Sequence, residues 1–131
     1  MVGTLALRRS AIGLPFVRVF RSLGARVEAA SPSFAETNDI VLSTRGLMMA
    51  TLHAEKLPRW RARMQPGLVW NIEQGLALDG ARIGRAELLR TELFHRMRTF
   101  LEKYEFLLAP VNQLPPFPAE QEYPTQIAGE L

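Results

Sequence analysis

The sequence predicts a helix-rich α/β fold with about two strands and four to five helices. Residues 16–30 are typical of a helix, a glycine and a short strand, a unit in which the helix covers the sheet that the strand enters. Residues 82–103 show a long helical pattern that runs into a short apolar strand at 106–109. We therefore expect residues 1–131 to form a single domain or part of one.

The first helix has clear signals at both ends. Pro15 can begin it, because the N–H that proline lacks has no partner in the first turn of a helix. Gly24 is a natural stop, and Val27, flanked by charged residues, favours a strand within 25–30.

The middle of the chain is predicted to be helical from Phe34 to about Leu57. Ser33 is a candidate N-cap, and Glu36 three residues later would complete a capping box. Gly46 weakens the middle of this segment, so that a bend or two helices are possible. Pro58 should stop or kink the helix.

Three further helical segments are expected, at 59–64, 69–78 and 82–103. Asp79 is a candidate N-cap for the last of them. Its apolar residues recur every three to four positions, which predicts one buried stripe made of Ile83, Ala86, Leu89 or Arg90, Leu93, Met97, Phe100 and Tyr104. Residues 106–109 read as a buried strand, and five prolines between 110 and 124 predict irregular structure for the tail, 110–131.

Composition excludes several classes of protein. Hydrophobic content of 47% and charged content of 22% are typical of a globular chain, and the absence of cysteine rules out disulfides. The net charge of +3 comes without an evident basic cluster or nucleic-acid-binding motif, so no nucleic-acid partner is expected. No apolar run has the length of a membrane span and no secretory pattern is present, which favours a cytoplasmic protein without a membrane partner.

No catalytic or metal-binding constellation is evident. None of the five serines lies in a Gly-rich context, and Lys56 and Lys103 lie within helical patterns. His53 and His95 are too far apart in the sequence for a metal pair on one helix, and no phosphate-binding loop exists, so no metal and no cofactor are predicted.

Six residues are candidates for a substrate-proximal role. Asn71 and Gln74 share a helical face beside Trp70 and could line a polar pocket, although tying a loop to the helix is the more common use of such amides. Val111, Asn112 and Gln113 follow the apolar strand, and α/β proteins usually bind ligands at the carboxyl ends of strands.

Two blocks of the sequence together resemble the later part of amidase signature family hydrolases. They are Trp70-Asn71-Ile72-Glu73-Gln74-Gly75 and, after a long helix, Glu105-Phe106-Leu107-Leu108-Ala109-Pro110 with its Pro-rich continuation. The resemblance covers about residues 16–129 and leaves a basic N-terminus, 1–15, unmatched.

The resemblance implies a partial amidase-like domain built on a mixed sheet flanked by helices. It implies hydrolysis of a small carboxamide substrate by the parent enzyme, whose catalytic Lys–Ser–Ser region has no match in this chain. We therefore expect a C-terminal fragment that supplies strands and channel walls and is inactive alone, with the missing catalytic portion or a homo-oligomer as its partner. The alternative is a non-catalytic helical interaction protein or a complementing subunit.

Overall fold

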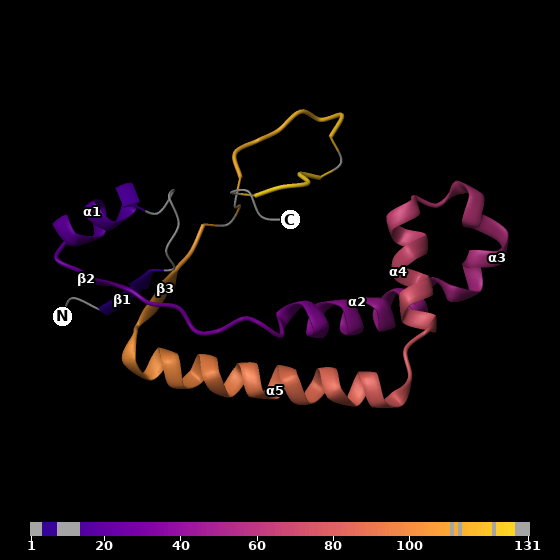
Figure 1. Cartoon of the computed structure of the whole chain (residues 1–131), viewed down its shortest axis with the longest axis horizontal. Coiled ribbons are helices and arrows are strands. Elements are labelled where there is room, and N and C mark those ends of the chain that lie inside the picture. Colours follow the sequence, from indigo (N-terminus) through magenta and orange to yellow (C-terminus); the bar gives the residue numbers. More distant parts are fainter. Residues whose placement is uncertain (1–3, 8–13, 111, 113, 122, 128–131) are drawn as a thin grey trace. The chain divides into compact units, whose positions relative to one another are not determined.

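The computed structural model describes residues 4–7, 14–110, 112, 114–121 and 123–127. Their elements follow in the order β1 (Thr4–Leu7), α1 (Leu14–Ser22), β2 (Arg26–Ala29), α2 (Thr37–His53), the 3₁₀ helix η2 (Ala54–Lys56), α3 (Leu57–Trp60), the 3₁₀ helix η3 (Arg61–Arg63), α4 (Pro66–Leu76), α5 (Gly80–Lys103) and β3 (Phe106–Leu108) (Figure 1). Contacts divide the chain into two compact units: unit 1 combines Met1–Ser31 with Leu101–Leu131, and unit 2 is Pro32–Phe100. The helix-rich character and the short strands agree with the predicted α/β class.

Unit 1 contains a small parallel sheet in the order β2-β1-β3. β1 pairs with β2 from Thr4↔Arg26 to Leu7↔Ala29, and with β3 from Leu5↔Phe106 to Leu7↔Leu108. The sheet therefore has one strand more than the two expected, and the additional strand, β1, is central. Both pairings are parallel, whereas the resemblance implies a mixed sheet.

Helix α1 packs on β2, as the sequence predicts. The buried side chain of Val27 contacts Val17 and Phe20 of α1 and Leu108 of β3. Gly24 has φ of 89°, a left-handed conformation that glycine adopts without the steric cost of a Cβ atom, and so it can reverse the chain between α1 and β2. Its N–H donates to the carbonyl of Arg21 at 2.9 Å.

A polar contact in unit 1 joins β2 to the residue after α5. The Tyr104 hydroxyl donates a hydrogen bond of 2.9 Å to Oε2 of Glu28, and the Tyr104 side chain is buried. This hydrogen bond, together with the charges of Lys103 and Arg26, lowers the pKa of the Glu28 carboxyl below its ordinary value.

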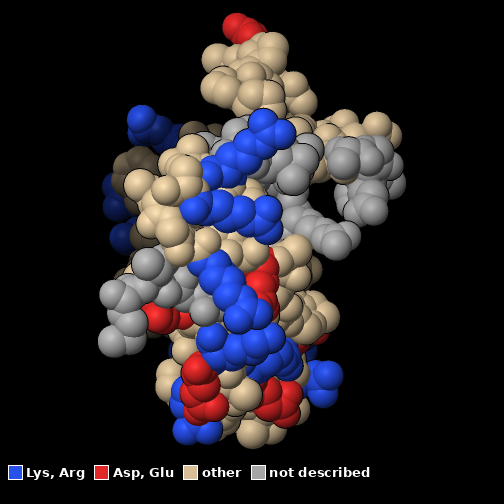
Figure 2. Space-filling model, turned by 90° about the vertical axis from the view of Figure 1, so that its left-hand side faces the viewer, with Lys and Arg blue, Asp and Glu red and all other residues tan. Residues whose placement is uncertain are grey.

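Basic and acidic side chains both occur on the face drawn in Figure 2.

Unit 2 is built on the close packing of α2 against α4. Their buried residues are Ile40, Ser43, Gly46 and Ala50 of α2, and Val69, Ile72 and Gly75 of α4. Gly46 and Gly75 lie at the closest point, where a Cβ atom built on Gly75 would be 1.9 Å from the carbonyl oxygen of Gly46. α2 is continuous through Gly46, and the absence of side chains at both positions lets the two backbones approach each other.

Helix α5 begins at an N-cap that was predicted from the sequence. Oδ1 of Asp79 accepts a hydrogen bond of 2.7 Å from the backbone N–H of Arg82, which satisfies one of the free donors of the first turn. Ala86 is buried, as is Tyr104 just beyond the helix, and the other members of the predicted stripe are half-buried apart from the alternative Arg90. The position of the stripe is therefore correct.

The predicted capping box at the start of α2 is wrong. The helix begins at Thr37, and its N-cap residue, Glu36, makes no capping hydrogen bond with its side chain. The Glu36 carboxylate instead forms an ion pair with Arg96 of α5. The guanidinium group of Arg96 also donates a hydrogen bond of 2.9 Å to the carbonyl oxygen of Ser33. The backbone N–H of Glu36 itself and the Arg96 guanidinium hold the pKa of Glu36 below its ordinary value. The ion pair with Arg96 thus occupies the Glu36 carboxylate, which the predicted capping box would have needed at the start of α2.

Two further expectations concern the end of the chain. β3 was predicted to be buried, but Phe106 is 58% exposed and Leu107 and Leu108 are half-buried, since β3 is an edge strand of the sheet. The predicted irregular tail agrees with the structure, because the described residues after β3 form neither helix nor strand beyond a single bridge at Ile127.

Candidate functional site

The first group of predicted site residues lies on α4. Trp70 and Gln74 are exposed, whereas Asn71 is half-buried. Nδ2 of Asn71 donates a hydrogen bond of 2.6 Å to the carbonyl oxygen of Gly67, one turn earlier on the same helix. The amide of Asn71 therefore has an intrahelical partner, and Trp70 and Gln74 present their polar and aromatic groups at the surface of unit 2.

The second predicted group follows β3 in unit 1. Asn112 is exposed and lines an open groove of about 610 Å³ together with apolar residues of the tail, which are Leu114, Pro115, Pro116, Phe117, Pro124 and Ile127. Val111 and Gln113 lie outside the described residues. The two predicted groups belong to different compact units of the chain.

Two glutamates of the helices, Glu73 and Glu87, form exposed ion pairs. Glu73 of α4 pairs with Arg61 of η3, and Glu87 pairs with Arg90 one turn later on α5 at 2.7 Å. His53 ends α2, and His95 packs edge-on against Phe94 on α5. Within the described ranges, no three His, Cys, Asp or Glu side chains gather where they could hold a metal ion.

A basic aromatic segment lies between α2 and α4. The guanidinium carbon of Arg59 is 5.3 Å from the ring centroid of Trp60, and that of Arg63 is 5.4 Å from it. Both distances fall within the range of a cation–π interaction. Trp60 thus contacts both Arg59 and Arg63. Arg61, which lies between them in the sequence, connects this segment to α4 through its ion pair with Glu73.

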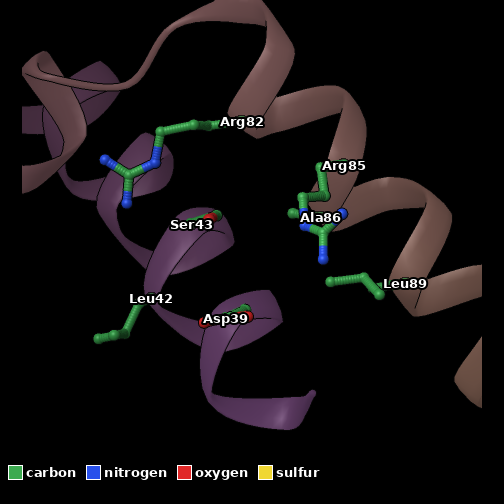
Figure 3. A pocket seen from close by; sticks show the side chains of 7 residues that line it. All are labelled: Asp39, Leu42, Ser43, Arg82, Arg85, Ala86 and Leu89. Atoms are coloured by element: carbon green, nitrogen blue, oxygen red, sulfur yellow. The ribbon is translucent and has the colours of Figure 1, made fainter.

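A cavity of about 200 Å³ lies between α2 and α5 of unit 2 (Figure 3). Its lining residues are Asp39, Leu42 and Ser43 of α2, and Arg82, Arg85, Ala86 and Leu89 of α5. In Figure 3, Arg82 reaches from α5 toward α2, and the guanidinium of Arg85 lies between the helices. Ser43 is the buried polar residue of this wall.

The cavity could not be predicted from the sequence, because the residues of its two walls are about forty positions apart. Arg82 and Arg85 follow one another by one helical turn, which is a weak signal on its own since most arginines at this spacing face solvent. In the sequence, nothing distinguishes Ser43 from other polar residues of a predicted helix. Only the packing of α5 beside α2 brings these groups together.

None of the described helices combines the length and the hydrophobicity needed to traverse a lipid bilayer.

Comparison with known proteins gives one distant similarity. No family model matches the chain, and no solved structure matches it. An acylamidase from Rhodococcus erythropolis is 25% identical over 123 residues, which cover 91% of this chain and 25% of that enzyme. The chain thus spans about a quarter of the length of the curated relative that it matches. The similarity indicates a distant amidase-like relationship.

Proposed function

We propose that this chain is the C-terminal segment of an amidase-like hydrolase that cleaves the C–N bond of a carboxamide. In this proposal it supplies strands and channel-wall helices, and the nucleophile and base come from another part of the enzyme. The observation that carries the proposal is the similarity to an acylamidase, which extends over 91% of the chain but only 25% of that enzyme. The five serines and two lysines of the chain lie outside any Gly-rich context, which supports a non-catalytic role for the segment.

Exposed apolar side chains on unit 2 support the idea that its helices pack against further protein. Met48 is 50% exposed and Leu52 is 57% exposed on α2, and Leu76 at the end of α4 is 58% exposed. Val41 and Leu47 add to the exposed apolar surface of α2. Apolar surface of this kind on neighbouring helices often marks an interface.

The substrate-proximal roles belong to the same proposal. Trp70 and Gln74 are accessible on α4, and Asn112 is accessible after β3. In an assembled hydrolase, these side chains would contact a small amide substrate without taking part in bond cleavage. The side-chain amide of Asn71 differs from these groups, because it already donates a hydrogen bond to the carbonyl oxygen of Gly67.

A second candidate function is that of a non-catalytic interaction protein or complementing subunit. The exposed apolar residues of α2 favour it as well, because a separate partner chain or a second copy could cover them. A monodisperse species that unfolds cooperatively, alone or with a partner, favours this candidate. Amide hydrolysis that appears only when the chain is joined to a catalytic segment favours the segment of a larger hydrolase.

The DNA on both sides of the reading frame tests the proposed function. We expect a neighbouring stretch that encodes a lysine and a Gly- and Ser-rich segment, in the same frame or an adjoining one. Expression of the joined sequence should then give amide hydrolysis, which replacement of the catalytic serine abolishes. Flanking DNA without such a stretch would overturn the proposal and direct attention to a partner protein.

A further inference from the structure

The cavity between α2 and α5 contains two arginines without a carboxylate partner. Among the ion pairs of the described residues, none includes Arg82 or Arg85, although Asp39 lines the same cavity. Arg90, further along α5, pairs with Glu87 at 2.7 Å. Arg96 of α5 is likewise paired, with Glu36, whereas Arg98 is in none of these ion pairs and does not line the cavity. Arg82 and Arg85 both line the cavity and are in none of these ion pairs, so that they are available to an anion.

Both arginines lie near the start of α5, which begins at Gly80. The carboxylate of Asp79 already caps this end of the helix through the backbone N–H of Arg82, so that the attraction for a further anion comes from the two guanidinium groups. A guanidinium group also matches the geometry of a carboxylate, to which it can donate two parallel hydrogen bonds.

The other walls limit what the anion can be. Leu42, Ala86 and Leu89 give the cavity an apolar part, and the hydroxyl of Ser43 can donate one further hydrogen bond. A volume of about 200 Å³ is below the usual range for drug-sized ligands, so a molecule of a few carbons fits best. The carboxylate of Asp39 repels a second negative charge, which disfavours dianions.

We propose that this cavity binds a small monocarboxylate with a short apolar tail. The carboxylate accepts hydrogen bonds from the guanidinium groups of Arg82 and Arg85, and the tail packs against Ala86 and Leu89. This proposal concerns binding alone and does not depend on the proposed hydrolase function.

Titration of the full 131-residue chain, labelled with ¹⁵N, tests the site by NMR. Sodium butyrate is the probe, and butyramide, which has the same shape without the charge, is its matched control. We expect butyrate to shift the backbone amides of Ser43, Ala86 and Leu89 in a saturable manner, and butyramide to leave them unchanged. Inorganic phosphate should bind more weakly than butyrate.

Substitutions on α5 and α2 separate this site from general charge effects. Arg85→Gln and Arg82→Gln should each weaken butyrate binding about tenfold, since each removes a charge-assisted hydrogen bond. Arg90→Gln removes the same charge from α5 outside the cavity and should have no effect. Asp39→Asn should strengthen binding by roughly threefold, because it removes a repulsive charge.

Three results would overturn the proposal. They are equal shifts with butyrate and butyramide, tighter binding of phosphate than of butyrate, and unchanged butyrate binding in both Arg82→Gln and Arg85→Gln. Because both arginines are exposed, these substitutions should leave the amide spectrum of unit 2 otherwise intact. No result of this titration bears on amide hydrolysis, so the two proposals can fail separately.

Discussion

Replacement of Gly75 by alanine tests the closest contact between α2 and α4. The added Cβ atom would lie 1.9 Å from the carbonyl oxygen of Gly46, 2.4 Å from the carbonyl carbon of Gly46 and 2.8 Å from Cβ of Ala50. Two of these three atoms belong to backbone, which cannot rotate away as a side chain can. The helices would therefore have to separate, and the packing around Ile72, which is fully buried, would be lost in part.

The expected cost follows from two opposing effects. Overpacking of a core destabilises a protein by about 1–3 kcal/mol, and contact with rigid backbone places Gly75→Ala near the upper end, at about 3 kcal/mol. Alanine is a better helix former than glycine by about 1 kcal/mol. The net loss in the free energy of unfolding is therefore about 2 kcal/mol.

Urea denaturation followed by circular dichroism at 222 nm measures this loss. With a denaturant slope of about 1–3 kcal/mol/M, a loss of about 2 kcal/mol should lower the midpoint by about 0.7–2 M. Gly84→Ala is the matched control, because a Cβ atom there meets no other atom within 4 Å and should stabilise α5 by about 0.5–1 kcal/mol. Gly75→Ala at or above wild-type stability would refute the proposed packing of α2 against α4.

Three other predictions concern polar groups. Tyr104→Phe should raise the pKa of Glu28 toward its ordinary value, because the hydroxyl that stabilises the carboxylate is lost; an unchanged ¹³C NMR titration of Glu28 would contradict the contact. Asp79→Ala should destabilise the protein by about 1 kcal/mol through loss of the α5 cap, whereas Asp79→Asn should retain most of that stability in urea denaturation. The lowered pKa of Glu36 implies a stabilising contribution that is present above pH 4.5 and is lost as the pH falls through the folded-state pKa. Glu36→Gln or Arg96→Gln should therefore reduce the acid sensitivity of unfolding, and an acid transition identical to that of the wild type would speak against the ion pair.

Elements with strong local signals could be predicted from the sequence. The proline and glycine at the ends of α1, the isolated Val27 of β2 and the Asp79 cap of α5 are all properties of a few consecutive residues. Because these signals act through local backbone conformation, the packing of the rest of the chain did not alter them.

Features that depend on distant contacts were missed. β1 has only four residues, and its place at the centre of the sheet comes from pairing with β2 and β3. Gly46 looked like a weak point of a helix, although it permits the close approach of α4 at Gly75. Glu36 looked like part of a cap, but Arg96, sixty residues later, is its partner.

The candidate site also combines residues that local patterns could place with residues that only distant contacts bring together. Trp70 and Gln74 could be placed on one helix from the apolar pattern of the sequence, and both are exposed on α4. The cavity beside Ser43 could not be foreseen, since its arginines come from a helix that begins some forty residues later. A role of Trp70 and Gln74 in substrate binding stays a prediction.

The central claim is that this chain contributes structure to an amidase-like hydrolase without contributing catalytic residues. The most direct measurement is the rate of ammonia release from short acyl amides, by the purified chain alone and by the protein expressed together with its neighbouring coding sequence. We predict no release above the buffer control for the chain alone and a clear rate for the joined protein. Turnover by the purified chain itself, or a joined protein without any turnover, would contradict the claim.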